Sequence, residues 1–181
     1  LSGVPILFET FFPSLQKHFE ISVSPWEKNG FATIFNDITE RKTTEEALKE
    51  SNSLLNGVLD AIEDVIAVQM PDHTIVRYNK AGCDMLRLTL DEIKGRKCHH
   101  LMGWPNECSP CATRMALESK RPETIEKYIP EMGRYYDCRS YPLQDETGEV
   151  KLIIEHLRDI TSQKTAAQEI MASEERYRLL V

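Results

Sequence analysis

The chain has 181 residues, of which 41% are hydrophobic and 28% charged, and its net charge is −7. This length and composition indicate a soluble globular protein with one domain of ordinary size and additional segments. The acidic balance argues against nucleic-acid binding, since the chain has no surplus of basic side chains to neutralise phosphates.

Cysteine content and apolar runs bear on where the protein works. Five cysteines are an odd number, and a chain of this length is not a short secreted disulfide framework, so we expect a reduced, cytoplasmic setting. No apolar run approaches the roughly 18 residues of a membrane span, and no signal peptide opens the sequence, so we expect no membrane contact by this chain. The sequence opens at Leu1 without an initiator Met. We therefore expect this chain to be part of a longer protein. A membrane anchor elsewhere in that protein is compatible with this expectation.

Three strands are predicted in the first 37 residues. Residues 5–13, 17–25 and 30–36 carry alternating or continuous apolar patterns with Phe, Ile and Val, separated by Pro, Asn and Gly. Three strands alone leave unpaired edges and an apolar face. We expect residues 1–37 to pack against a second chain or against the helix that follows.

A charged helix follows these strands. Residues 39–50 hold seven charges in twelve positions, without Gly or Pro, which predicts an exposed linker helix over residues 38–53. An apolar stripe with steps of seven suits pairing with a second helix. The alternative is a single amphipathic helix that lies on its own domain. The stripe consists of Leu48, Leu55 and Ile62, with Val58 and Val65 on the partner positions.

Residues 54–160 predict one complete α+β unit. A hairpin comes first, then two short helices, a cysteine-rich loop, a longer helix and three strands. Thr89 and Glu92 form a T-x-x-E capping box at one helix start. A further helix is expected over residues 161–181. The predicted strands are 64–71, 74–80, 122–130, 134–143 and 150–158, and the predicted helices lie within 81–95 and 111–120.

Two parts of the chain repeat each other. FETFFP and KHFEISVSP, within residues 8–25, match IEKYIP and RYYDCRSYP, within residues 125–142, at a spacing of 117 residues. FATIFNDITERK at 31–42 matches IIEHLRDITSQK at 153–164 at a spacing of 122 residues. A period near 120 residues is typical of tandem copies of a whole domain. We interpret residues 1–37 as the C-terminal strands of a preceding copy.

Three stretches of the complete unit carry a family resemblance. They are IVRYNKAGCDMLRLTLDEIKG at 75–95, YYDCRSYPL at 135–143, and the ending DIT, which occurs at 37–39 and again at 159–161. With this order and spacing, residues 54–160 resemble the PAS domain, the sensory box of signalling proteins. The resemblance implies a PAS fold, in which a five-stranded antiparallel sheet carries short helices on one side and long linker helices flank the unit.

The resemblance also implies a function. Tandem PAS copies joined by helices look like the input end of a sensor histidine kinase or a related receptor. The implied partners are neighbouring PAS and kinase domains and a second copy of the chain, met through the linker helices and the sheet. The sequence has no Gly-rich phosphate loop and no histidine-kinase elements, so we expect binding rather than catalysis by this chain. The alternatives are a ligand-free PAS dimerisation and relay spacer, and a thiol-based redox protein.

At each DIT, a strand continues directly into a helix. Asp159 or Thr161 can accept hydrogen bonds from the unpaired N–H groups at the helix start. A change on the concave face of the sheet would then alter the start angle or the pairing of the output helix, as a two-state relay requires. The alternative is an ordinary helix cap.

The stretch GRKCHHLMGWPNECSPC holds three of the five cysteines. The two-residue gap between Cys108 and Cys111 lets both thiolates reach one ion. Cys98 lies ten residues upstream of Cys108, and His99 or His100 would add a nitrogen for zinc. A fourth sulfur would instead suit an iron–sulfur cluster.

Three interpretations of this loop stay open: a metal site, a thiol pair that oxidises, and an inert cysteine-rich loop. Cys138 is the distant candidate for a fourth sulfur, but it occupies the apolar core position of Ile21 in the other copy. A flavin is disfavoured, since GRKCHHLM shares only Gly, Cys and Leu with the light-oxygen-voltage branch. Haem is disfavoured because the helix at 111–120 has no histidine.

Four further side chains are candidates for a small-molecule pocket between the sheet and the short helices. Trp104, Tyr128 and Tyr136 would line such a cavity, although aromatic residues at alternating strand positions are usually core. His156 takes the place of Ile34 in the other copy, so it lies on a sheet face. It either lines the pocket or is a hydrogen-bonded core histidine.

Overall fold

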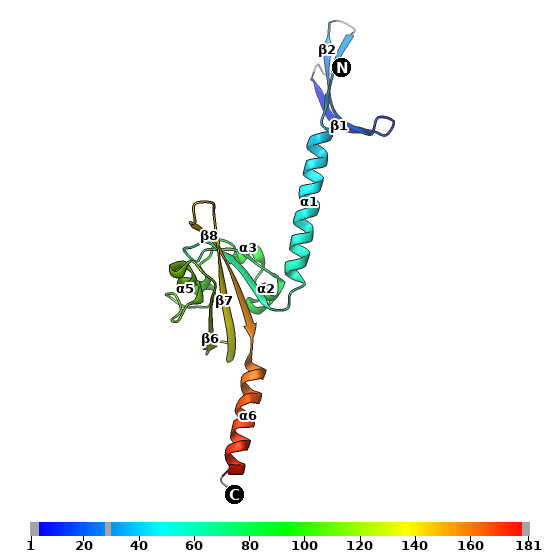
Figure 1. Cartoon of the computed structure of the whole chain (residues 1–181). Helices are drawn as coiled ribbons and strands as arrows, with labels where there is room; N and C mark the ends of the chain where they lie inside the picture. The colour runs from blue at the N-terminus through cyan, green and yellow to red at the C-terminus, as the bar shows by residue number, and fades with distance from the viewer. Residues whose placement is uncertain (1–3, 28–29, 179–181) are drawn as a thin grey trace. The chain divides into compact units, whose positions relative to one another are not determined.

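The computed structural model describes residues 4–27 and 30–178 (Figure 1). The chain divides into two compact units, one up to Leu55 and one from Asn56, and each is described by itself. Within the described ranges, no helix is long and apolar enough to cross a membrane.

The first unit is a small antiparallel sheet followed by the start of a helix. β1 (Ile6–Phe12), β2 (Lys17–Trp26) and β3 (Gly30–Asp37) pair in the order β1-β2-β3, so the three predicted strands are confirmed. Ile21 of the central strand is buried, whereas Phe35 of β3 is exposed. The small sheet therefore leaves apolar side chains on its surface.

Helix α1 (Thr39–Asp60) is longer than the predicted 38–53. It stops where the side-chain amide of Asn79 binds the carbonyls of Leu59 and Ile62 and so turns the chain into the second sheet. The predicted stripe with steps of seven does not continue past this point, and that part of the prediction is wrong. Leu48, Leu55 and Val58 lie exposed on α1, whereas Ile62 lies in the following turn and Val65 opens the next strand.

The second unit is built on a five-stranded antiparallel sheet in the order β5-β4-β8-β7-β6. Four short helices and the long helix α6 complete it (Figure 1). The predicted α+β fold, with five antiparallel strands and this succession of strands and helices along the chain, is confirmed. The strands are β4 (Val65–Gln69), β5 (Ile75–Tyr78), β6 (Glu123–Ile129), β7 (Arg134–Gln144) and β8 (Val150–Asp159), and the helices are α2 (Lys80–Leu86), α3 (Leu90–Ile93), α4 (Cys98–Leu101), α5 (Ala112–Ser119) and α6 (Thr161–Arg178).

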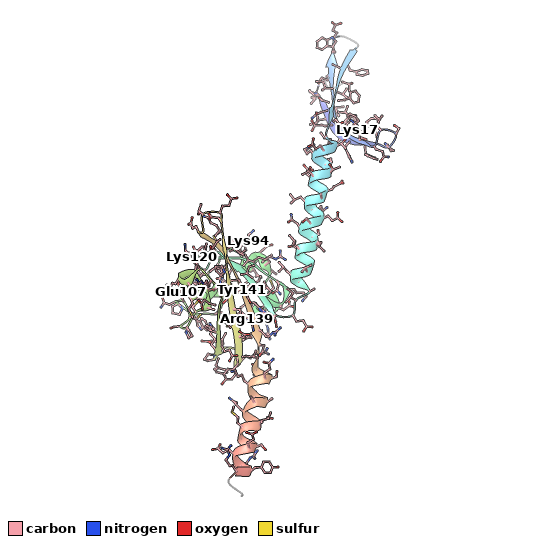
Figure 2. All side chains as sticks on the ribbon, viewed as in Figure 1. Lys17, Lys94, Glu107, Lys120, Arg139 and Tyr141 are labelled. Carbon is pink, nitrogen blue, oxygen red and sulfur yellow. The ribbon has the colours of Figure 1, made fainter. Side chains whose placement is uncertain are left out.

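Alternation along the strands directs one face of this sheet towards the short helices. On β7, Arg139 and Tyr141 are exposed, whereas Ser140 between them is fully buried (Figure 2). The buried face packs against the helices in two apolar clusters. One centres on Val65, Ala67, Ile75, Tyr78 and Ile93, and the other on Ala112, Ile129, Tyr136 and Cys138.

Cys138 lies fully buried in the second cluster, as its alignment with Ile21 predicted. A free cysteine there behaves as a small hydrophobe, and burial raises the pKa of its thiol to about 12. The capping box at the start of α3 is also confirmed, because the Thr89 hydroxyl accepts from the Glu92 N–H and the Glu92 carboxylate accepts from the Thr89 N–H.

Asn79 joins three segments of the second unit. Its side chain is 1% exposed. Its Oδ1 caps α2 by accepting from the N–H of Gly82, and also accepts from the N–H of Ile66 on β4. Its Nδ2 donates to the carbonyl of Leu59 in the last turn of α1 and to the carbonyls of Ile62 and Asp64 between α1 and β4. One side chain therefore makes five hydrogen bonds in the core.

Candidate functional site at the cysteine loop

The cysteine-rich stretch folds as the short helix α4, which the sequence analysis missed, followed by a loop that leads to α5. A cavity of about 40 Å³ lies between this stretch and the sheet. This volume is far below the roughly 300 Å³ of an ordinary ligand pocket, so the cavity has room for a few water molecules. Cys98, His99, Met102, Trp104 and Cys108 line it from the helix and loop, and Tyr78, Lys127, Ile129, Glu155 and Leu157 line it from the sheet.

Two charged side chains reach this cavity from the sheet. Lys127 is half-buried on β6, and Glu155 is half-buried on β8. Burial raises the pKa of Glu155 to about 7, against the opposing effect of the Lys127 ammonium. The sequence analysis missed both residues. Glu155 alternates with the apolar Ile153 and Leu157 on the same face of β8, and this position was the signal that could have identified it.

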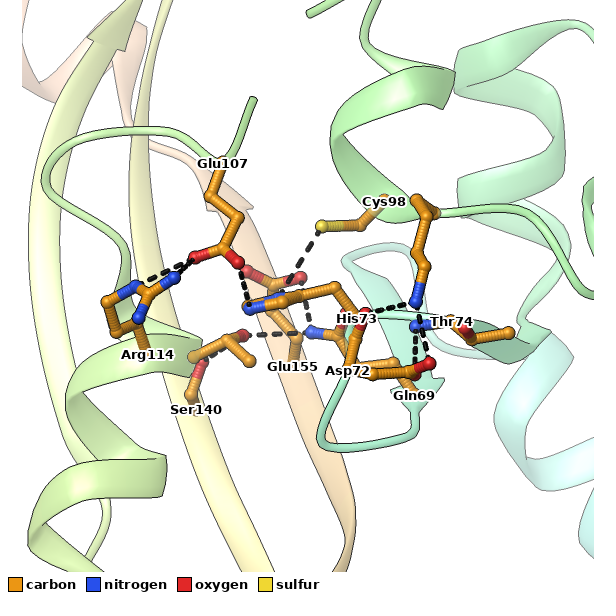
Figure 3. Close-up of polar contacts among 11 residues, drawn as sticks. Gln69, Asp72, His73, Thr74, Cys98, Glu107, Arg114, Ser140 and Glu155 are labelled. Atoms are coloured by element: carbon orange, nitrogen blue, oxygen red, sulfur yellow. Dashed lines mark hydrogen bonds and ion pairs between the residues drawn. The ribbon is translucent and has the colours of Figure 1, made fainter. Parts of the chain in front are cut away.

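A chain of buried polar groups extends from Glu155 across the sheet (Figure 3). Gln69 Nε2 lies 3.3 Å from Glu155 Oε2 and 2.8 Å from Thr113 Oγ1. Thr113 Oγ1 in turn lies 3.1 Å from Ser140 Oγ. Gln69, Thr113 and Ser140 are each at most 1% exposed. These contacts fix the Glu155 carboxyl beside the cavity.

Cys108 lies where the loop meets β6. Its Sγ is 3.0 Å from Lys127 Nζ. Hydrogen bonds from the Cys111 thiol and from Lys127 lower the pKa of Cys108 well below the usual range of a thiol, against the effect of burial. The pKa of Cys111 is raised, first by its bond to Cys108 and then by burial. The pKa values of the two thiols in this loop are therefore shifted in opposite directions.

Cys98 has different surroundings from Cys108. Burial raises the pKa of its thiol to about 12, and its Sγ lies 4.0 Å from Nδ1 of His73. On its other side, His73 Nε2 lies 3.3 Å from Glu107 Oε1, and Glu107 accepts a hydrogen bond from Arg114 Nε at 2.7 Å (Figure 3). Burial lowers the pKa of His73. The neutral thiol of Cys98 thus faces a buried histidine.

The structure brings the predicted metal ligands only partly together. Cys98, Cys108 and His99 line the interior cavity, whereas Cys111 lines an outer cleft with Cys108 and His99. Across residues 4–27 and 30–178, no three His, Cys, Asp or Glu side chains are grouped so that they could hold a metal ion. A zinc ion or an iron–sulfur cluster at these residues stays a prediction.

Of the four predicted pocket residues, Trp104 lines the interior cavity. Its Nε1 donates to Glu131 Oε1 at 2.7 Å. Tyr128 is 50% exposed and lines an outer cleft, and Tyr136 is buried in the core. His156 belongs to the other face of β8, where its Nε2 lies 2.7 Å from Asp64 Oδ2. The structure therefore does not bring these four residues to one pocket.

The junction between β8 and α6 is tied to the neighbouring strand β7. The N–H of Thr161 donates to Asp159 Oδ1 at 2.9 Å, as the helix-cap prediction required. The Thr161 hydroxyl accepts from the N–H of Tyr135 on β7 at 3.0 Å. Ile160 N–H donates to the carbonyl of Tyr135 at 2.9 Å. The first turn of α6 is therefore fixed to two strands.

The first unit has the same junction between β3 and α1. The N–H of Thr39 donates to Asp37 Oδ1 at 3.0 Å, and the Thr39 hydroxyl accepts from the N–H of His18 on β2 at 3.0 Å. Ile38 N–H donates to the His18 carbonyl at 2.9 Å. Each contact has its counterpart in the second unit, so the two DIT segments form the same local structure.

Comparison with known proteins gives the family of this chain. The family model of the PAS fold matches residues 59–165, and the chain belongs to this family. It therefore contains a sensory PAS domain, and PAS domains are generally sensory rather than catalytic. A search of curated proteins found no match.

Solved structures share this fold. The PAS domain of Bordetella pertussis BvgS has a TM-score of 0.50 at 19% identity, covering 71% of this chain and 98% of that one. The PAS domain of an HTR-like protein from Haloarcula marismortui has a TM-score of 0.50 at 22% identity, covering 66% and 99%. The histidine kinase ThkA, solved in complex with the response regulator TrrA, has a TM-score of 0.52 at 22% identity, covering 67% of this chain and 35% of that one.

Proposed function

We propose that this chain is the sensory and relay module of a two-component receptor. In this proposal, a small ligand, a metal ion or a redox change acts at the cavity and the cysteine loop. The resulting strain passes through β8 into α6 and on to an output domain, a histidine kinase. The chain itself binds and relays, and the output domain performs the catalysis.

One observation carries this proposal, namely the continuity of β8 with α6. Glu155 and Leu157 line the cavity, and α6 begins at Thr161 on the same run of chain. The hydrogen bonds of Thr161 and Ile160 to Tyr135 tie the helix start to β7 as well. A displacement of the inward side chains of β8 therefore acts on the direction of α6 with no flexible segment between them.

The repeated register supports tandem copies in the parent protein. The pairs Phe8–Ile21 and Ile21–Phe35 in the first sheet have counterparts at equivalent positions of the second sheet, Ile125–Cys138 and Cys138–Leu157. In this proposal, residues 1–37 end a preceding PAS copy, and both α1 and α6 are linker helices. The exposed Leu48, Leu55 and Val58 of α1 would face a second copy of the chain in a homodimer.

The proposal places the chain in the cytoplasm, because a reducing compartment suits a chain whose five cysteines are all free. Its partners there are a second copy of the chain and the neighbouring PAS and kinase domains of the parent protein. A membrane anchor elsewhere in the parent protein is compatible with this proposal. A second candidate function is a ligand-free dimerisation and relay spacer. The small volume of the interior cavity, about 40 Å³, favours this alternative.

The relay is tested by Thr161→Val in the chain joined through α6 to the dimerisation and catalytic domains of a histidine kinase. This change removes the acceptor of the Tyr135 N–H but keeps a β-branched residue in the helix. We expect autophosphorylation to change by about tenfold, in the range of ordinary coupling energies between sites. The matched control is Thr165→Val, because the Thr165 hydroxyl bonds only within α6. Wild-type autophosphorylation in both variants would exclude a relay through this junction.

The metal alternative at the cysteine loop has its own test. If Cys98, Cys108, Cys111 and His99 hold an ion, protein purified without oxygen or chelators will contain about one zinc per chain, or iron with sulfide and a visible absorption band. The metal content should fall to background in a Cys108→Ser/Cys111→Ser variant. Metal that persists in this variant would have to bind elsewhere.

A further inference from the structure

Lys127 provides the starting point because its charge has an unusual partner. The side chain is half-buried, and its Nζ donates to Cys108 Sγ at 3.0 Å. Among the described residues, no carboxylate lies within 4.0 Å of this ammonium. A buried ammonium requires a compensating anion or strong acceptors. The Lys127 ammonium is therefore placed to stabilise a thiolate at Cys108.

Cys111 is placed to react with Cys108 after a first oxidation. It is 8% exposed, it lies at the start of α5, and it follows Cys108 at C-x-x-C spacing, with both sulfurs lining the same cleft. Both sulfurs are free. A thiolate beside a protonated thiol is the arrangement in which one sulfur attacks an oxidant and the other closes a disulfide.

Small oxidants have a path to Cys108. Two clefts, of about 540 Å³ and 470 Å³, are lined by the segment Cys108–Pro110, and the larger one also includes Cys111. In contrast, Cys138 is fully buried, and burial raises the pKa of Cys98 and of Cys83. Reactivity should therefore be concentrated at one of the five cysteines.

We propose that Cys108 and Cys111 form a reversible dithiol–disulfide switch that hydroperoxides oxidise, and that its state is the signal this module senses. The claim that the state of this switch is the sensed signal rests on the proposed sensory function. The thiol chemistry itself does not depend on it.

The oxidation proceeds in two balanced steps. The Cys108 thiolate attacks one oxygen of the hydroperoxide, the O–O bond breaks, and hydroxide (or alkoxide) leaves with the electron pair, so that Cys108 becomes a sulfenic acid. The Cys111 sulfur then attacks the Cys108 sulfur, and the S–OH oxygen leaves as water with the Cys111 proton. The peroxide is reduced by two electrons and the dithiol is oxidised by two. A cellular dithiol restores the pair by thiol–disulfide exchange.

Disulfide formation removes the anion that faces Lys127. The ammonium then remains half-buried, with Glu155 of β8 as the neighbouring acidic group that lines the same cavity. Attraction between Lys127 and Glu155 is no longer balanced by the repulsion between Glu155 and the thiolate. The oxidation therefore changes the charge on the inward face of β8, the strand that continues into α6.

The first test uses the wild-type chain, reduced and metal-free, with hydrogen peroxide as the oxidant. We expect mass spectrometry to find a Cys108–Cys111 disulfide that dithiothreitol reverses, while Cys83, Cys98 and Cys138 stay reduced. Competitive alkylation should label Cys108 about tenfold faster than any of these three. Equal labelling of all cysteines would overturn the inference, as would stoichiometric zinc or iron on protein purified without chelators, because the metal would occupy the same sulfurs.

Variants then test the roles of the two partners. In Cys111→Ser, oxidation should stop at a Cys108 sulfenic acid that dimedone traps. Lys127→Met should slow the oxidation about tenfold at neutral pH, and Lys127→Arg should restore most of the rate. Lys94→Met, at an exposed lysine after α3 (Figure 2), is the matched control and should oxidise like the wild type. A wild-type rate in folded Lys127→Met would contradict the assigned role of Lys127.

Amide hydrogen exchange tests separately whether the disulfide forms and whether its formation is transmitted to α6. We expect the disulfide to alter amide exchange in the first turns of α6, and Thr161→Val to suppress this response without preventing the disulfide. If no disulfide forms while Thr161→Val still changes kinase output, the inference fails and the proposed relay stands. If the disulfide forms but α6 does not respond, the switch is not the signal.

Discussion

Replacing Asn79 with alanine should lower the free energy of unfolding of the second unit by about 4 kcal/mol, because buried donors and acceptors lose their partners at once. The side chain is 1% exposed and makes five hydrogen bonds, to the end of α1 and the turn after it, to β4 and to the first turn of α2. Urea denaturation followed by circular dichroism measures the change. The matched control is Asn106→Ala in the exposed part of the cysteine loop, which should stay within about 0.5 kcal/mol of the wild type.

Asn79→Asp separates the two halves of this network. The aspartate keeps an oxygen for the N–H groups of Ile66 and Gly82, but it sets a second oxygen against three carbonyls. We expect it to be at least as destabilising as the alanine, since a carboxylate facing carbonyls is repelled rather than merely unpaired. If both variants unfold like the wild type, Asn79 does not hold these segments together.

The same side chain explains one failure of the sequence analysis. The predicted helix 38–53 was too short, whereas the apolar stripe was continued through Ile62 to Val65, because no Gly or Pro lies between Asp60 and the start of β4 to interrupt it. The helix ends because of contacts with Asn79, which is distant in the sequence. In contrast, the strands carry their own alternation and their own Gly and Pro breaks, and each was predicted within a few residues.

The candidate site was harder to predict from the sequence than the fold, because its contacts depend on the tertiary structure. The C-x-x-C spacing identified Cys108 and Cys111, but the contact between Cys108 and Lys127 results from the path of the loop over β6, which no local pattern encodes. His156 was considered as a pocket residue because it aligns with Ile34. In the second unit, His156 lies on the face of β8 opposite to Glu155, where it contacts Asp64, so alignment with an apolar residue did not identify the inward face. The inward position was that of Glu155, next to it in the sequence.

Glu155 should make the stability of the second unit depend on pH. Burial raises its pKa from an ordinary value of 4.5 to about 7, so the folded state favours the protonated carboxyl. This contribution to stability is fully present below the unfolded pKa and is lost as the pH rises through the folded pKa. We expect Glu155→Gln to match the wild type at about pH 4, below the unfolded pKa, and to be more stable by about 3 kcal/mol at about pH 8.

The control for this prediction is Glu118→Gln, which removes an exposed carboxylate from α5. Its difference from the wild type should not vary between the two pH values, whereas the Glu155→Gln difference should grow with pH. Groups that both proteins share cancel in each comparison, and urea denaturation at both pH values provides the measurement. A Glu155→Gln variant that is less stable than the wild type above neutral pH would mean that the folded state favours the carboxylate. The attraction to Lys127 would then outweigh the burial of Glu155, and the charge balance inferred for the reduced site would be reversed.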